Sequence, residues 1–135
     1  MTSRLAFGSG ARENVRTNLV QSIPCRINHD GPAGVSSYFT PYVTEKSTDE
    51  TVESSFRGYP LQGSKVELPH GFQGLIATEL DNPLSVDSER NLSVTGKFDH
   101  LTCWNWDHTP GKDDGLQHAV NWLPISSVVK FYLIN

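Results

Sequence analysis

Residues 52–68, VESSFRGYPLQGSKVEL, decide the fold class of this chain. The part before Gly58 alternates between apolar and polar residues, and the part after it continues the pattern through Leu61 and Val66. Alternation with a period of two is typical of a β-strand with one buried face. Gly58 and Gly63 interrupt the pattern, and glycine often marks a turn or a bulge. The stretch therefore predicts short strands that break at these two glycines.

Further strands are expected on both sides of this stretch. Apolar, β-branched and aromatic runs bounded by turn residues indicate strands at 19–27, 35–44, 71–80, 92–98 and 100–106. Pro24 marks an edge position or a bulge because proline cannot donate a ladder hydrogen bond, and Pro41 kinks the second run. Gly74 suggests a bulge or a close approach of backbone. Short strands joined by Gly and Pro turns predict an all-β, mainly antiparallel sandwich or barrel.

The C-terminal segment carries two conflicting signals. Ile125, Val128, Val129 and Tyr132 are spaced as on one face of a helix, and Pro124 suits a first helical turn. The same residues have strong β propensity. Periodicity is the better guide, so a short C-terminal helix is favoured over a strand.

The domain organisation is expected to be simple. Residues 1–18 have three arginines, one glutamate and no apolar period, which predicts a flexible N-terminal tail, with a mitochondrial presequence as the alternative. Residues 19–135 are expected to form a single β-barrel domain with an acidic, exposed loop at 81–91. The inward-facing candidates are few, as in a subunit that shares its core with a partner.

Composition excludes several classes of protein. The 135 residues include 11 Lys and Arg against 15 Asp and Glu, for a net charge of −4, and no basic stripe of the kind that binds nucleic acid. Eleven Gly and eight Pro argue against a coiled coil or a helical bundle. No run approaches the roughly 20 apolar residues that span a bilayer. Cys25 and Cys103 are expected to be small buried thiols in a reducing compartment because no secretory leader is apparent, with a disulfide or redox pair as the alternative.

A search for catalytic chemistry finds no constellation. The five histidines form no helical pair and the cysteines no CxxC, so a zinc site lacks its usual ligands. Asp107, Asp113 and Asp114 lie with His108 on one polar loop, which favours a solvated turn over a two-metal site. No GxSxG is present, and Cys103 is expected to be an inert thiol inside an apolar strand.

The aromatic residues allow a nucleic-acid interpretation that the charge disfavours. Tyr38, Phe39, Tyr42, Trp104 and Trp106 could stack bases on an OB-like barrel. Such a surface needs interleaved Lys and Arg, because phosphate contacts supply most of the affinity. Few basic residues lie near either group, so the aromatic residues are assigned to a core or an interface. An OB-like single-stranded nucleic-acid-binding domain and a small ligand-binding or hydrolytic barrel remain the alternatives.

An ordered set of motifs resembles the family of the non-catalytic C subunit of eukaryotic ribonuclease H2. The motifs span roughly residues 19–130 and comprise Ile23-Pro24-Cys25-Arg26-Ile27, His29-Asp30-Gly31-Pro32-Ala33, Tyr38-Phe39-Thr40-Pro41, Ser55-Phe56-Arg57-Gly58, Leu68-Pro69, Pro110-Gly111 and Trp122-Leu123-Pro124-Ile125. One such block would be a weak signal, whereas the ordered set is specific.

The resemblance implies a non-catalytic scaffold. Members of that family pair with the B subunit, also a scaffold, in an intertwined, all-β triple barrel, and together they support the catalytic subunit. The heterotrimer cleaves RNA in RNA–DNA hybrids and nicks DNA at embedded ribonucleotides. No cofactor is expected in this chain, magnesium being used by the catalytic subunit. Nuclear localisation and the absence of a membrane partner are implied as well.

The resemblance also implies two sets of interface residues. The set expected to face the B subunit is Asp30, Pro32, Tyr38, Phe39, Phe56, Arg57 and Leu61. The set expected to face the catalytic subunit is Trp104, Pro110, Gly115, Trp122 and Ile125. Within the first set, Asp30 is expected to cap backbone N–H groups of its turn. Arg57 is either a solvated strand end or a bidentate ligand of a carboxylate or backbone group across the subunit boundary.

Overall fold

The structure is a computed structural model that describes residues 3–6, 16–17, 20–46, 50–79 and 90–133. Its residues fall into two compact units, which are described separately below. One unit contains residues 20–70 and 100–135, and the other contains residues 1–19 and 71–99. The predicted N-terminal tail and the acidic loop at 81–91 lie largely outside the described residues.

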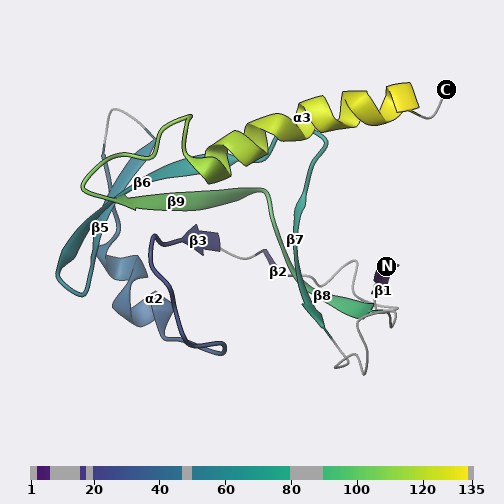
Figure 1. The fold of residues 1–135 in the computed structure, drawn as a ribbon. Helices are drawn as coiled ribbons and strands as arrows, with labels where there is room; N and C mark the ends of the chain where they lie inside the picture. The colour runs from purple at the N-terminus through teal and green to yellow at the C-terminus, as the bar shows by residue number, and fades with distance from the viewer. Residues whose placement is uncertain (1–2, 7–15, 18–19, 47–49, 80–89, 134–135) are drawn as a thin grey trace. The chain divides into compact units, whose positions relative to one another are not determined.

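A five-stranded sheet forms the first unit (Figure 1). Its strand order is β3 (Val20–Ser22), β9 (His100–Trp106), β6 (Tyr59–Glu67), β5 (Thr51–Phe56) and β4 (Thr44–Glu45). Every neighbouring pair is antiparallel except β3 and β9. The alternating stretch at 52–68 therefore forms the predicted strands, but Gly63 lies inside β6 and does not break it.

The core of this unit is a cluster of three buried side chains, Phe39, Leu61 and Trp104. The rings of Phe39 and Trp104 meet edge to face with centroids 5.5 Å apart, a favourable aromatic geometry. The Nε1–H of Trp104 donates to Gln21 Oε1 at 2.6 Å, so the buried indole keeps its hydrogen bond. Burial of this cluster holds β6 and β9 against the segment that precedes β4.

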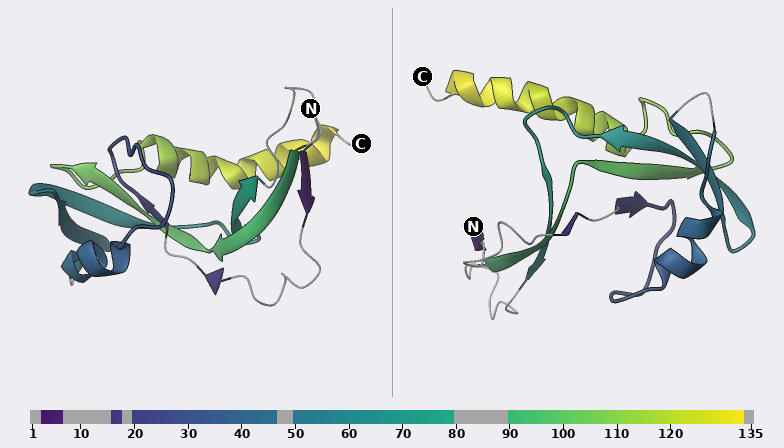
Figure 2. Two further views of the ribbon diagram at one scale, coloured as in Figure 1. Left: turned by 90° about the horizontal axis from the view of Figure 1, so that it is seen from below. Right: turned by 180° about the vertical axis from the view of Figure 1, so that it is seen from behind.

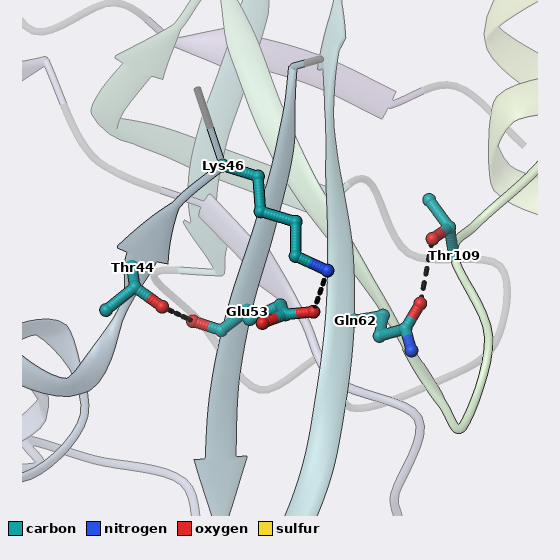
Figure 3. Close-up of polar contacts among 5 residues, drawn as sticks. All are labelled: Thr44, Lys46, Glu53, Gln62 and Thr109. Carbon is teal, nitrogen blue, oxygen red and sulfur yellow. Dashed lines mark hydrogen bonds and ion pairs between the residues drawn. The ribbon is translucent and has the colours of Figure 1, made fainter. Parts of the chain in front are cut away.

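Polar contacts attach an edge strand and a loop to the central strands of the sheet (Figure 3). Thr44 Oγ1 donates to the Glu53 carbonyl at 3.3 Å, and Lys46 forms an ion pair with the Glu53 carboxylate. On the far side of β6, Thr109 Oγ1 donates to Gln62 Oε1 at 2.8 Å. These bonds attach the short edge strand β4 and the loop after β9 to the central hairpin.

The second unit is built around β8 (Arg90–Phe98). β7 (Gly74–Glu79) pairs with it antiparallel, with a register shift at Ile76/Ala77. β1 (Ser3–Ala6) and β2 (Arg16–Thr17) pair with it in parallel. The Phe98 ring occupies the space where a Cβ on Gly74 would stand, so the close approach at this glycine is made by a side chain and not by backbone.

The segment at 35–44 is mainly helical, so the strand predicted there is wrong. It forms the short helix α2 (Val35–Tyr38) and the 3₁₀ turn η1 (Thr40–Tyr42). Phe39 between them is buried, whereas most other residues of the segment are exposed. The strand expected at 19–27 is shorter than predicted and ends at Ser22, before Pro24.

The C-terminal helix is confirmed, although it is long and begins earlier than expected. α3 spans Gly115–Leu133, and Pro124 lies inside it instead of in its first turn. Figure 2 shows its N-terminal turns beside β6 and β9. Val120 is buried, and Gln117 Nε2 donates to Ser64 Oγ of β6 at 2.9 Å.

The all-β, mainly antiparallel class with a C-terminal helix is thus confirmed. Neither sheet closes into a barrel among the described strands. The five-stranded sheet ends in β3 and β4, which are only three and two residues long. The outer edges of β9 and β5 are consequently paired over only part of their length.

Candidate functional site

The hairpin between β5 and β6 turns through two residues, Arg57 and Gly58. Phe56 pairs directly with Tyr59, and both loop residues have positive φ, 50° for Arg57 and 81° for Gly58. Two positive φ values are what a type I′ hairpin turn requires. Arg57 is exposed, and its guanidinium carbon lies 5.7 Å from the centroid of the Phe56 ring. The hairpin therefore holds the cation at its tip.

A groove of about 790 Å³ opens beside this tip. Three segments of the same unit line it: the chain after β3, the β5–β6 hairpin and the end of β9. Their lining residues are Cys25, Arg26, Ile27, Asn28, His29, Phe56, Arg57, Tyr59, Pro60, Trp106 and Asp107. The groove thus combines two arginines and one carboxylate with several large apolar side chains.

Trp106 holds the three segments together. Its Nε1–H donates to the Pro24 carbonyl at 2.9 Å, which fixes the chain after β3 against the end of β9. Its ring meets the Tyr59 ring edge to face at 5.8 Å, which joins the hairpin to the same point. The walls of the groove are therefore preformed by one indole that contacts both neighbours.

The residues assigned to the boundary with the B subunit separate into buried and exposed groups. Phe39 and Leu61 are buried in the chain's own core, with Phe56 packed against them. The exposed ones are Asp30, Pro32, Tyr38 and Arg57. In the turn after β3 the contact is between His29 Nε2 and the Pro32 carbonyl, at 3.5 Å, and Asp30 has no hydrogen bond to any described residue.

The residues assigned to the boundary with the catalytic subunit lie mainly on α3 and the loop before it. Gly115 begins the helix, and Trp122 and Ile125 are about half exposed on it, at 54% and 48%. The Trp122 Nε1–H donates to His118 Nε2 at 3.0 Å, which orients the indole. Pro110 is buried, and Trp104 is only 2% exposed because it packs on Phe39.

The described side chains contain no group that suggests chemistry. No cluster of three or more His, Cys, Asp or Glu able to hold a metal occurs among the described residues. Both cysteines are free. Burial, reinforced by the negative charge of Asp114, raises the pKa of the Cys103 thiol, so it remains protonated at neutral pH.

Within the part of the chain that the structure describes, none of the helices has both the length and the apolar character needed to cross a bilayer.

Sequence reasoning misses most of the groove. Arg26, Ile27, Tyr59 and Asp107 are assigned to no site by the sequence, because they come from three separate segments and share no period. The one local signal is Gly58, which marks a turn between the two strands and so places Arg57 at its tip. Trp104 and Trp106 are two residues apart on β9, so their side chains lie on the same face of the sheet, and Trp106 packs against the core cluster as well as lining the groove.

Comparisons with known proteins agree with the ordered motifs. The family model described as Ribonuclease H2 non-catalytic subunit (Ylr154p-like) matches residues 19–91. The ribonuclease H2 C subunit of Mus musculus is 28% identical over 93% of this chain and 89% of the mouse protein. The ribonuclease H2 C subunit of Bos taurus is 28% identical over 79% of this chain and 77% of the bovine protein. An uncharacterised protein of Schizosaccharomyces pombe is 29% identical over 81% of this chain and 80% of the yeast protein.

The family match covers more than half of the chain and includes β3, the β5–β6 hairpin and β7. The similarity to the mouse protein extends over almost the full length of both chains. This chain belongs to the non-catalytic subunit family of ribonuclease H2, the family of the C subunit.

Proposed function

We propose that this chain is the structural subunit of a ribonuclease H2 heterotrimer, in which it pairs with the B subunit and positions the catalytic subunit. The assembled enzyme cleaves RNA in RNA–DNA hybrids and nicks DNA at embedded ribonucleotides, with magnesium held by the catalytic subunit. The complex acts in the nucleus. The observation that carries the proposal is the similarity to the ribonuclease H2 C subunit along nearly the whole chain.

Two features of the fold support a shared β structure. The five-stranded sheet ends in strands of three and two residues, so a partner strand has backbone donors and acceptors available on β9 and β5. Among the described residues, eight hydrophobic side chains are buried and ten large ones are exposed. Such an apolar surface is typical of a subunit buried in an obligate assembly.

The exposure of several of these side chains supports the two proposed partner surfaces. Arg57, Tyr38, Asp30 and Pro32 offer contact area to the B subunit, with Phe39, Phe56 and Leu61 supporting them from the core. Trp122 and Ile125 form the surface for the catalytic subunit, with Gly115 at the start of their helix and Pro110 and Trp104 beneath. Exposed Trp and Arg are the residue types enriched at interface hot spots.

Co-purification tests the proposal. A tagged copy of this chain, eluted under native conditions, is expected to carry two partners at 1:1:1 stoichiometry and to cut a duplex with one embedded ribonucleotide. The chain alone is expected to be inactive and unstable, and to aggregate unless it is dilute. A folded, partner-free monomer that binds single-stranded oligonucleotide with a steep salt dependence would contradict the proposal and favour the OB-like alternative.

A further inference from the structure

The groove beside the β5–β6 hairpin contains positive charges that no described residue of this chain neutralises. Arg26 and Arg57 both line it, and neither forms an ion pair with any described carboxylate. The ion pairs among the described side chains involve Lys46 and Lys65, which do not line the groove. A guanidinium presents a planar fork of donors that matches a carboxylate. The two arginines are therefore available to an anionic group from another molecule.

The same groove exposes apolar surface next to these cations. Ile27 is 60% exposed and Tyr59 is 65% exposed, and both line the groove with the indole of Trp106. Tyr, Trp and Arg are the residues most enriched where one protein binds another. The combination matches a peptide segment that carries an acidic side chain near an apolar one.

Backbone strain marks the same place. Among the described residues only Arg57 and Asp107 are non-glycine residues with positive φ, and both line the groove. Such conformations cost free energy and tend to occur at functional sites. Two independent turns, one after β5 and one after β9, thus hold strained residues at the rim of one groove.

From this arrangement we propose that the groove binds an acidic–apolar peptide segment of a partner subunit. Arg26 and Arg57 bind the carboxylate, and Ile27, Tyr59 and Trp106 contact the apolar side chain. A nucleic-acid backbone fits less well, because Asp107 places a negative charge in the groove and the chain carries a net charge of −4. The inference rests on the proposed function in one respect, namely that the segment comes from a subunit of the same complex.

Site-specific cross-linking in the assembled complex identifies the occupant. The photoreactive amino acid p-benzoylphenylalanine replaces Tyr59, and as a matched control it replaces Tyr42, which is equally exposed at 63% but lies outside the groove. Position 59 is expected to cross-link to one partner peptide containing Asp, Glu or a C-terminal carboxylate, and position 42 is not. A cross-link to nucleic acid, or no cross-link above the position 42 level, would overturn the inference.

Charge reversal tests the role of the arginines. Arg26→Glu is expected to weaken binding of the partner subunit by about tenfold or more, because it brings like charges together. Lys65→Glu makes the same change of charge outside the groove and is expected to have little effect. Equal effects of the two substitutions would overturn the inference. Exchanging the cross-linked acidic residue for Arg is expected to restore binding to Arg26→Glu.

Cysteine alkylation gives a readout that needs no substitution. Cys25 lines the groove and is partly exposed, whereas Cys103 is buried and serves as an internal reference. Alkylation of Cys25 is expected to slow on assembly, and Cys103 to remain unreactive in both states. A complex that forms and leaves Cys25 equally reactive would overturn the inference alone. Failure to form any complex would overturn the proposed function and the inference together.

Discussion

At the scale of single residues, Arg57 occupies a backbone position that suits other residue types. Its φ of 50° is followed by Gly58 at 81°, and Asn-Gly is the pair most favoured in two-residue hairpin loops of this kind. Arginine has a Cβ and no short polar group to compensate for the left-handed conformation. Arginine at this position therefore makes the turn less stable than asparagine would, but it places a guanidinium at the rim of the groove.

Replacing Arg57 by Asn is expected to change the stability of the chain and its affinity for partner subunits in opposite directions. Arg57→Asn should raise the free energy of unfolding by up to about 1 kcal/mol, because Asn tolerates the positive φ. The same variant should bind its partner subunits more weakly, because the guanidinium is lost. Urea denaturation of the chain and affinity measurements on the complex provide the two readouts.

Arg57→Ala is the matched control for this pair of effects. It removes the same charge and keeps the strain, so it should weaken assembly without raising stability. If Arg57→Asn left assembly unchanged, the guanidinium would have no role at the subunit boundary.

Three buried side chains show what the sequence does not determine at the residue scale. The apolar character of Phe39, Leu61 and Trp104 is evident in the sequence, and it fits a core or an interface. The family resemblance is what assigns them to subunit interfaces. The structure packs all three into one cluster within this chain. A sequence shows that a side chain will be buried, but it does not show which chain supplies the covering atoms.

At the scale of secondary structure, the strands with clear alternation are the ones that the sequence predicts well. β5, β7, β8 and β9 fall close to where the pattern places them, and β6 does so as well except that it runs through the break predicted at Gly63. The prediction for 35–44 fails because β propensity reflects how well a side chain fits a half-buried pleated surface. There, Val35, Tyr38 and Tyr42 are exposed and have no sheet neighbour.

For the C-terminal helix, the predicted element is correct and its predicted start is wrong. Its periodicity is visible from Ile125 onward, but proline is expensive inside a helix, so the sequence favours Pro124 in the first turn. The helix instead begins at Gly115, after a loop in which Asp114 accepts hydrogen bonds from the Gly111 N–H and from Asn105 Nδ2. The hydrogen bond from Gln117 to Ser64 of β6 and the burial of Val120 anchor its first turns.

Gly63 illustrates why a glycine can lie within a strand. It pairs with Trp104 on one side and Val52 on the other, and a Cβ there would lie 2.7 Å from Trp104 Cε3 and 2.8 Å from Val52 Cγ2. Gly63→Ala is therefore expected to lower the free energy of unfolding by about 1–3 kcal/mol, the usual cost of overpacking. Chemical denaturation of the chain measures the change.

Gly111→Ala is the control for this substitution. A Cβ at Gly111 would meet no atom within 4 Å, so its effect on stability should stay within about 0.5 kcal/mol. Equal destabilisation by the two substitutions would mean that the close contact with Trp104 is not the cause.

At the scale of the whole molecule, the buried side chains are unevenly distributed. The unit of residues 20–70 and 100–135 contains the buried residues Phe39, Leu61, Val66, Leu101, Cys103, Trp104, Pro110 and Val120, as well as Gly63. In the other unit, side-chain burial is described for residues 71–78 and 92–99, and among these only Val94 and Gly96 are buried. Since hydrophobic burial is the dominant favourable term in folding, the two units should differ in local stability.

Hydrogen–deuterium exchange measures that difference directly. In the dilute chain alone, amides of β6 and β9 should exchange about tenfold or more slowly than those of β7 and β8, because opening the second unit exposes little apolar surface. On assembly, β7 and β8 should gain more protection than β6 and β9, because partner side chains supply the core that this unit lacks. Equal protection of all four strands before assembly would contradict this account. It would show that the unit around β8 completes its own core, and the partners would then bind two preformed units.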